Sequence, residues 1–446
     1  GEESLVTATA TGATYNSKDV ATANTVNYTG VALGGTGAGN YTLAASTAQG
    51  AGRITPKQLN LALASGARFD KTYDGTANVT QSLTKDGNYT LTNFVNGEGA
   101  DIALAPVTGT YTDKNAGTGK TVTFGGLTLT GTGAGNYTID KTVLTGIGTI
   151  TKRALTLGEV TAQSKTYDGT TAADAGKFRA ALTNAIAGDS VTATATGAAY
   201  NDKNVAAANR IDYTGIALAG ADAGNYSLAA TTAQGVGTIT KRTLTASAVG
   251  AQTKTYDGTR TADAAKFHAT LGNVVAGEEN LVSATAAGAA YNDKNVARAN
   301  AVGYTGVALQ GAGAGNYTIA DTAQGAGTIT QRALTLGAVA AQSKTYDGTT
   351  AADTSKFGAT LNNAVAGDSV TATATGAAYN SKNVATAATI DYTGVGLAGA
   401  DAGNYTLAAT AVRGAGSITH RALTLTADAQ SIVQGEALPS FTGRAD

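Results

Sequence analysis

The residues of this sequence best suited to chemistry are aspartates and tyrosines that return in a fixed pattern. The tetrad Tyr-Asp-Gly-Thr follows a Lys-Thr pair four times. Each Asp precedes a Gly, where its side chain can accept hydrogen bonds from its own turn. We therefore interpret this set as structural turn residues: Tyr73, Asp74, Gly75, Tyr167, Asp168, Gly169, Tyr256, Asp257, Gly258, Tyr346, Asp347 and Gly348.

Calcium binding is the alternative chemistry for these carboxylates. In one repeat, four side chains could converge on one ion: Asp168, Asp174, Asp189 and Asp202. The sequence has no Asp-x-Asp-x-Asp-Gly loop and no Gly-Asp nonapeptide repeat. We expect no cofactor and no metal, with calcium as the open possibility.

A lysine and an asparagine also return at constant spacing, represented by Lys203 and Asn225. A lysine and an asparagine can be crosslinked covalently through a buried acid. The competing interpretation is two exposed turns that carry turn-forming residues. Lys203 and Asn225 are thus crosslink candidates, and turns are the favoured interpretation.

Of the 19 tyrosines, 18 occupy four recurring positions, represented by Tyr167, Tyr200, Tyr213 and Tyr226. They could form a ladder of aromatic platforms for sugar rings. Alternatively, each ring packs half-buried with its hydroxyl bonded to a turn, as in β-sandwich domains. Phe124 replaces one of these tyrosines, so a hydroxyl is dispensable at that position, and the structural interpretation is favoured.

Catalysis has little support in this sequence. The two histidines, His268 and His420, lie at different places in the repeat, so no Ser-His-Asp set recurs. No phosphate-binding Gly motif opens a helix. We expect no catalytic residues and a protein that is not an enzyme.

These motifs mark modules of about 90 residues. The tetrads begin at intervals of 94, 89 and 90 residues, and Ala-Gly-Asn-Tyr returns five times. Solenoid repeats are shorter, about 20 to 50 residues, whereas small β domains have this length. We expect modules at 57–152, 153–241, 242–331 and 332–420, preceded by the C-terminal part of another at 1–56 and followed by the start of a different module at 421–446.

Thr alternates with apolar residues in runs such as Val191 to Thr196, bounded by Asp-Gly and Gly-Asn turns. Period-two alternation predicts strands. About seven strands per module predict an all-β protein of tandem immunoglobulin-like β-sandwiches. Phe178, Leu182, Ala185 and Ile186 lie at helical spacing, so an α+β grasp-like module with a short helix is the alternative.

The junctions contain no Gly/Ser or Pro-rich linker. Thr149 to Leu157 runs from the last strand of one module into the first strand of the next, with about two polar residues between them. At about 3.3 Å per strand residue, five modules end to end would extend roughly 150 Å. We expect a semi-rigid extended rod.

Composition excludes several classes of function. The net charge is −1 and charged residues are scattered, so neither a nucleic-acid surface nor membrane insertion is expected. Cysteine is absent, which excludes disulfides and thiol chemistry and suits an oxidising compartment. Gly1 falls in mid-repeat, so we expect a longer parent protein with any export signal elsewhere.

Four motifs taken in order carry a resemblance: Lys-Thr-Tyr-Asp-Gly-Thr, Asp-Lys-Asn-Val, Ala-Gly-Asn-Tyr and Gly-Thr-Ile-Thr-Lys-Arg. The chain resembles the YDG repeats of very large bacterial secreted and surface adhesins, including filamentous-haemagglutinin-like proteins exported by two-partner secretion. The tail from Leu423 is similar to the start of an MBG-type module, but it lacks the expected tyrosine after Ser431.

The resemblance implies an extracellular stalk at a bacterial cell surface or in a biofilm matrix, and it assigns no binding residue. We expect these modules to hold a distal binding domain away from the cell and to bear tension in cell adhesion. The alternative is multivalent binding of exopolysaccharide or of other adhesin chains, with avidity supplying strength. Buried tyrosines would favour the stalk, and exposed tyrosines would favour the binding protein.

Overall fold

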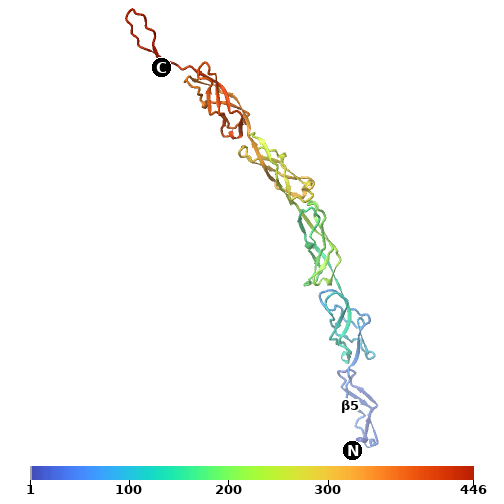
Figure 1. Cartoon of the computed structure of the whole chain (residues 1–446). Coiled ribbons are helices and arrows are strands. Elements are labelled where there is room, and N and C mark those ends of the chain that lie inside the picture. Colours follow the sequence, from blue (N-terminus) through green and yellow to red (C-terminus); the bar gives the residue numbers. More distant parts are fainter. Residues whose placement is uncertain (1–2) are drawn as a thin grey trace. The chain divides into compact units, whose positions relative to one another are not determined.

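The computed structural model describes residues 3–446, and contact clustering divides the chain into two units. The first unit contains residues 1–164, 171–203 and 207–238, and the second contains 165–170, 204–206 and 239–446. Figure 1 colours the chain by sequence and labels β5, the last strand of the first module. Each unit is described by itself.

In the first unit, every module has one larger sheet and smaller strand groups around it. The first module has the sheet β2 (Gly12–Tyr15), β3 (Thr25–Thr29) and β5 (Thr47–Ala51), the pair β1 (Thr7–Thr9) and β4 (Ala32–Gly34), and the 3-10 turns η1 (Glu3–Leu5) and η2 (Ala38–Asn40). The second module has the sheet β10 (Thr110–Tyr111), β11 (Gly117–Phe124), β14 (Leu144–Thr151) and β7 (Lys71–Thr72), the sheet β13 (Tyr137–Ile139), β6 (Lys57–Leu63) and β8 (Tyr89–Thr92), the pair β12 (Leu129–Thr130) and β9 (Ala103–Leu104), and η3 (Ala134–Asn136).

The third module repeats this plan with nine strands. Its elements are the sheet β16 (Gln163–Thr166), β23 (Thr232–Thr240), β20 (Arg210–Thr214) and β19 (Gly197–Tyr200), the sheet β17 (Ala180–Thr183), β15 (Arg153–Val160) and β22 (Tyr226–Leu228), the pair β18 (Thr192–Thr194) and β21 (Ala217–Ala219), and the turns η4 (Ala175–Lys177) and η5 (Ala223–Asn225).

The second unit holds the fourth and fifth modules and the tail. The fourth has the sheet β26 (Gln252–Thr255), β33 (Thr322–Thr330), β30 (Ala301–Thr305) and β29 (Gly288–Tyr291), the pairs β24 (Arg242–Thr243) with β32 (Tyr317–Thr318), β25 (Thr245–Ser247) with β27 (Thr270–Gly272) and β28 (Ser283–Thr285) with β31 (Ala308–Gln310), and the turns η6 (Ala264–Lys266), η7 (Glu279–Leu281) and η8 (Ala314–Asn316). The fifth has the sheet β35 (Gln342–Thr345), β42 (Ala411–Thr419), β39 (Thr389–Thr393) and β38 (Gly376–Tyr379), the sheet β36 (Ala359–Asn362), β34 (Arg332–Val339) and β41 (Tyr405–Leu407), the pair β37 (Thr371–Thr373) and β40 (Gly396–Ala398), and the turns η9 (Thr354–Lys356) and η10 (Ala402–Asn404). The tail forms the hairpin β43 (Leu425–Ala427) and β44 (Gly443–Ala445).

In the fifth module the core lies between the four-stranded and the three-stranded sheet. In β39, Thr-Ile-Asp-Tyr-Thr alternates, so that Ile390 and Tyr392 are fully buried. They pack with Ile418 from the same sheet and with Leu336 and Val339 from the three-stranded sheet. The protein is therefore an all-β chain of tandem two-sheet modules, as the alternation predicts.

The helical alternative is wrong. Within residues 3–446 the helical segments are single 3-10 turns, and the Phe178–Ile186 stretch contains strand β17 instead of a helix. Its apolar residues occur at helical spacing by coincidence, because Phe178 follows η4 while Leu182 belongs to the strand. No helix among the described residues is long and apolar enough to cross a membrane.

Candidate functional site: the joints between modules

The Tyr-Asp-Gly turn is fastened by the lysine of its own motif. Asp74 accepts hydrogen bonds from the backbone N–H and the hydroxyl of Thr76, both at 2.9 Å. Lys71 Nζ donates to Asp74 at 2.7 Å and to the carbonyl oxygen of Asn78 at 2.8 Å. The same lysine–aspartate bond recurs in the other three turns, at 2.7 to 2.8 Å: Lys165–Asp168, Lys254–Asp257 and Lys344–Asp347.

Hydrogen bonds from the neighbouring lysine and threonine keep these turn aspartates ionised. The pKa of Asp347 falls to about 2, chiefly because Lys344 donates a hydrogen bond to it. The lysine and backbone bonds likewise lower the pKa of Asp74, although burial opposes them. The carboxylate therefore remains a hydrogen-bond acceptor and keeps the turn closed.

The glycine of the turn is required by its backbone and by a neighbour. Gly75 has a φ of +80°, which L-residues rarely adopt. A Cβ at Gly75 would lie 3.0 Å from the Ile186 side chain of the following module, and one at Gly258 would lie 2.8 Å from Val365. The turn thus packs directly against the next module. We call such an intermodule contact a joint.

Three of the four turn tyrosines, Tyr73, Tyr167 and Tyr256, donate a hydrogen bond from the hydroxyl to an acid of the next module. Tyr73 is fully buried and donates to Asp189 Oδ2 at 2.8 Å, and Tyr226 donates to the same oxygen at 2.6 Å. The two rings meet edge to face, with centroids 5.4 Å apart. Lys114 Nζ lies 3.6 Å from the other carboxylate oxygen, and the Asp189 side chain is only 6% exposed.

Burial and the hydrogen bonds within this cluster shift the pKa values of Asp189 and Tyr73. The hydrogen bond from Tyr226 is the main cause of a lowered pKa at Asp189, assisted by Tyr73 and Lys114. Burial and the neighbouring carboxylate raise the pKa of Tyr73 to about 12. The phenols stay protonated as donors and the acid stays ionised as acceptor, so these bonds are charge-assisted and stronger than neutral ones.

The second unit contains the same arrangement twice. Asp368 Oδ2 accepts from Tyr256 at 2.8 Å and from Tyr405 at 2.5 Å, with Lys294 Nζ 4.0 Å from Oδ1. Glu278 accepts from Tyr167 and Tyr317, each at 2.7 Å. An aspartate and a glutamate therefore perform the same role.

The asparagine of Ala-Gly-Asn-Tyr forms a second link at each joint. Asn225 Oδ1 accepts from the backbone N–H of Ala116 at 2.9 Å, and its Nδ2 donates to Asn115 at 3.2 Å. Asn404 makes the matching bonds to Val296 and Asn295, at 2.9 and 3.0 Å. Asn316 makes them to Val205 and Asn204, both at 2.9 Å. The side-chain amide thus docks on the polar turn that follows the preceding module's lysine.

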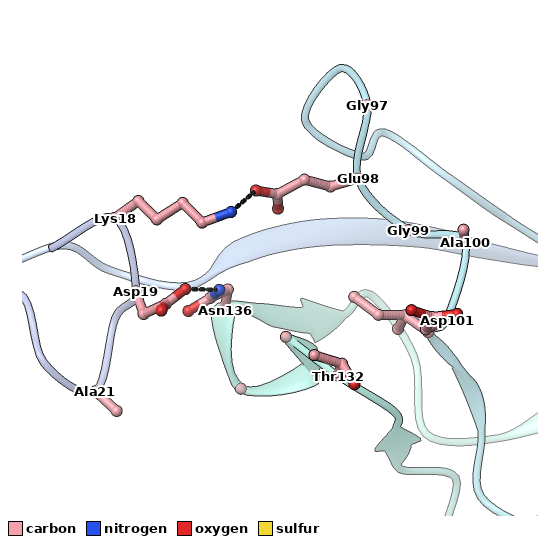
Figure 2. A pocket seen from close by; sticks show the side chains of 13 residues that line it. Lys18, Asp19, Ala21, Gly97, Glu98, Gly99, Ala100, Asp101, Thr132 and Asn136 are labelled. Carbon is pink, nitrogen blue, oxygen red and sulfur yellow. Dashed lines mark hydrogen bonds and ion pairs between the residues drawn. The ribbon is translucent and has the colours of Figure 1, made fainter.

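The joint between the first and second modules has a pocket beside its acid. Figure 2 shows Lys18 bonded to Glu98, at 3.2 Å, and Asn136 bonded to Asp19, at 2.9 Å. Glu98 also accepts from Tyr137 at 2.6 Å. The described part of the first module contains no Tyr-Asp-Gly turn, and the pocket is lined by Glu98 and Asn136 together with Lys18 and Asp19.

The structure shows the bonds of Asn225, one of the two crosslink candidates. The carboxamide of Asn225 lies on the Asn115–Ala116 turn of the preceding module, which is the turn that carries Lys114. Lys203 instead precedes Asn204, whose side chain binds Asn316. The asparagine's observed role is a noncovalent bond across the joint.

Three of the four aspartates considered for calcium have other partners. Asp168 binds Lys165, Asp174 caps η4 through the N–H of Gly176, and Asp189 receives two tyrosines. Among residues 3–446, no group of three or more acidic or histidine side chains is placed to hold a metal. His268 and His420 are both exposed.

Most recurring tyrosines are buried, as the structural interpretation expected. Tyr167, Tyr200, Tyr213 and Tyr226 are all at most 4% exposed. The exposed exceptions lie in the first module and at the last Tyr-Asp-Gly turn: Tyr15, Tyr28, Tyr41 and Tyr346. The rings that would form a sugar-binding ladder are therefore mostly inside the cores and joints.

Phe124 replaces a tyrosine for a reason visible in the structure. Its counterpart Tyr213 accepts a hydrogen bond from Gln163 at 2.6 Å. In the second module the position of that glutamine is held by Phe69, whose ring lies 4.7 Å from that of Phe124. The donor and the acceptor are thus replaced together, which leaves no unpaired buried polar atom.

Sequence reasoning missed the role of the acid in each joint and the role of the lysine in each turn. Glu98, Asp189, Glu278 and Asp368 recur at intervals of 91, 89 and 90 residues, so the period itself contained the signal. The change between Glu and Asp concealed it. The lysines Lys71, Lys165, Lys254 and Lys344 were visible in the motif but had no assigned role.

Comparison with known proteins defines the class to which these modules belong. The chain matches the YDG domain family five times, over residues 1–49, 55–144, 151–233, 240–324 and 330–412. This protein belongs to the YDG domain family and consists of tandem copies of that domain. No curated protein matches it.

Solved structures of tandem β domains show a distant likeness. Drosophila N-cadherin EC1-4 shares 9% identity at a TM-score of 0.23, covering 80% of this chain and 98% of that one. The protocadherin GammaB4 extracellular domain shares 7% at 0.24, covering 88% and 73%. The human desmocollin-1 ectodomain shares 8% at 0.18, covering 86% and 84%. At TM-scores below 0.5, this likeness carries no functional information.

Proposed function

We propose that this chain is a noncatalytic, load-bearing stalk segment of a very large extracellular bacterial adhesin. The observation that carries the proposal is the parallel pairing of the last strand of a module with a strand near the start of that module. In the fifth module β35 follows the first strand, and it pairs in parallel with the last strand β42, from Gln342 opposite Gly416 to Thr345 opposite Thr419. The same parallel pairing joins β26 to β33 and β7 to β14.

This pairing has a mechanical consequence. Tension reaches β35 through the first strand β34 and pulls β35 toward its N-terminal end, while it pulls the last strand β42 toward its C-terminal end. Because the two strands run in the same direction, they are pulled lengthwise past each other, and all their ladder bonds bear load together. Separation then requires several bonds to break at once, which suits a module under tension.

The joints support the same role. Each buried acid ties a tyrosine of one module to a tyrosine of the next, and each asparagine adds two bonds. Only Lys152 separates β14 from β15 at one junction, so little chain is free to bend. We infer a semi-rigid rod of modules in solution.

The adhesin assignment rests on the family and the composition. We infer a filamentous-haemagglutinin-like parent exported by two-partner secretion, located at a bacterial surface or in a biofilm matrix. The cysteine-free sequence suits that compartment. The tail from Leu423 would begin an MBG-type module. Buried tyrosines favour a stalk over repeated binding of exopolysaccharide or of other adhesin chains, since they leave few aromatic platforms.

Single-molecule pulling on the whole chain from its two ends tests the mechanical role. We expect repeated force peaks separated by roughly 300 Å of released chain, because about 90 residues extend by 3.3–3.6 Å each. Extension at low force without peaks would contradict the proposal. Small-angle scattering tests whether the chain is an extended rod in solution. Titration with matrix polysaccharide should show no binding. Tight binding to the polysaccharide would favour the alternative function.

A further inference from the structure

The joints bring together tyrosine rings from neighbouring modules. Tyr73 and Tyr226 meet edge to face, with ring centroids 5.4 Å apart and ring planes at 79°. The second unit repeats this contact with centroids 5.3 Å apart, in the pairs Tyr167–Tyr317 and Tyr256–Tyr405. Ring contacts inside modules include a phenylalanine instead, as in Phe178–Tyr213, Phe267–Tyr304 and Phe357–Tyr392. Two phenols in contact are therefore a recurring feature of the joints.

The two phenols of a joint direct their hydroxyl ends at the same acid. Tyr256 and Tyr405 both donate to Oδ2 of Asp368, at 2.8 and 2.5 Å. A hydroxyl and the two carbons ortho to it occupy the same end of a phenol ring. The shared oxygen therefore draws the ortho carbons of the two rings toward each other. Both rings are at most 3% exposed, so the surrounding side chains hold them in this contact.

Tyrosine is also the most easily oxidised side chain of this sequence. The chain contains 19 tyrosines and no cysteine, methionine or tryptophan. Cysteine and methionine are common targets of oxidants in other proteins, and here they cannot compete. A one-electron oxidant that acts on these side chains therefore takes its electron from a tyrosine.

The acid of the joint supplies the base that this oxidation requires. A phenol that has lost an electron is a strong acid, so its proton passes to a hydrogen-bonded carboxylate. Asp189, which binds Tyr73 and Tyr226, has a lowered pKa and is therefore ionised and able to accept a proton. This transfer avoids a charged phenol in the buried joint, where an unpaired charge would be costly.

We propose that the paired tyrosines of these three joints are sites of oxidative crosslinking, at which a peroxide-driven one-electron oxidant joins the two rings. Each phenol loses one electron to the oxidant and one proton to the acid, which passes the proton to water. A carbon–carbon bond then forms between one ortho carbon of each radical. The hydrogens of these two carbons move to the two oxygens, which restores both hydroxyls. Two phenols and one hydrogen peroxide thus give one linked pair and two waters.

The product is a covalent bond between consecutive modules. The ring planes of Tyr256 and Tyr405 already cross at 79°, and two directly bonded rings can keep such a twist. The linked joint could no longer open by breaking hydrogen bonds alone. The proposal does not depend on the stalk function, because it requires only the geometry of the tyrosine pair.

Oxidation of the whole chain with light, tris(bipyridine)ruthenium(II) and persulfate tests this proposal, because the reagent removes single electrons. Peptide mass spectrometry identifies the linked tyrosines, since each link removes two hydrogens. In dilute protein we expect at least about ten times more Tyr256–Tyr405 link than Tyr256–Tyr392 link, because only the first pair is held in contact. Tyr392 is a matched control, since it is buried in the same module as Tyr405 but has Phe357 as its ring partner.

A variant and a labelling experiment separate this reaction from accidental coupling. Tyr405→Phe keeps the ring, so it should abolish the link to Tyr256 and leave the Tyr73–Tyr226 link of the same chain unchanged. In a mixture of isotope-labelled and unlabelled chains, the joint links should form within single chains. The proposal is refuted if Tyr256 links to Tyr405 no more often than to Tyr392, or if these links form only between chains.

Discussion

Removing the acid from one joint should loosen that joint and leave the modules folded. Asp368→Ala takes away the acceptor shared by Tyr256 and Tyr405, whose hydroxyls lie 2.8 and 2.5 Å from Oδ2. Both tyrosines are at most 3% exposed, so water cannot readily replace the lost acceptor. The substitution acts on the contact between the fourth and fifth modules.

The magnitude follows from the number of orphaned groups. An unsatisfied buried hydroxyl costs about 1–3 kcal/mol, so two cost about 2–6 kcal/mol of joint stability. Since about 1.4 kcal/mol corresponds to a factor of ten, the open population of the joint should rise at least about 30-fold. The Lys294 contact adds little, because its ion pair is 4.0 Å long and the lysine is 44% exposed.

Hydrogen exchange measured by mass spectrometry on the whole chain reports this opening. The N–H of Val296 donates to Asn404 and the N–H of Val365 donates to the hydroxyl of Tyr405, so peptides containing these amides should exchange faster. Asp391→Ala is the matched control, because Asp391 binds Arg413 on an exposed sheet face. Equal exchange at Val296 and Val365 in the two variants would refute the reasoning.

Further predictions concern the contacts at this joint and at the joint between the second and third modules. Tyr256→Phe keeps the ring and removes the hydroxyl that donates to Asp368. In chemical denaturation we expect the free energy of unfolding to fall by about 1.5–3 kcal/mol, which is less than for Asp368→Ala. An unchanged denaturation midpoint would show that this hydrogen bond contributes nothing to stability. Asn404→Ala should speed hydrogen exchange of the Val296 amide and leave exchange in the fifth-module core around Ile390 unchanged, because the side-chain bonds of Asn404 lie only at the joint. Equal or slower exchange of the Val296 amide would contradict this prediction. The pKa of Tyr73 is raised from its ordinary value of 10 to about 12, so its contribution is present below pH 10 and is lost as the pH rises toward 12. Melting temperatures between pH 9 and 11.5 should therefore fall more steeply in the unmodified chain than in Tyr73→Phe, and parallel curves would exclude this contribution. Asp189 acts in the opposite direction: its lowered pKa gives stability above its ordinary value near 3.8 that is lost as the pH falls below it.

Local alternation was enough to predict the all-β fold. Thr-Ile-Asp-Tyr-Thr in β39 places Ile390 and Tyr392 on one face, and the period near 90 residues marked the repeated unit. The false helical signal at Phe178 to Ile186 arose because apolar residues there serve two partners. Phe178 packs on Tyr213 in its own module, while Ile186 lies against Gly75 of the preceding one.

The joints could not be predicted by considering modules one at a time. Tyr73 and Asp189 are 116 residues apart and belong to different modules, so no local pattern connects them. Asp189 was noticed only as a possible calcium ligand, because a carboxylate's partners depend on what the fold brings to it. The constant spacing drew attention to Asn225, but the interpretation as a residue of an exposed turn is wrong. Asn225 is 4% exposed, because its side chain is bound to the neighbouring module.

The shared acid also determines how one module's stability depends on the next. Tyr73 belongs to the core of the second module, yet its hydroxyl finds its acceptor only when the third module is folded around Asp189. Such an array behaves as a one-dimensional chain of units with a favourable nearest-neighbour term. Interior modules gain this term on both sides, and modules at the ends gain it once. Thermal unfolding should therefore begin in the end modules and progress inward. Adding modules should raise the cooperativity of unfolding of the array more than it raises the stability of any single module.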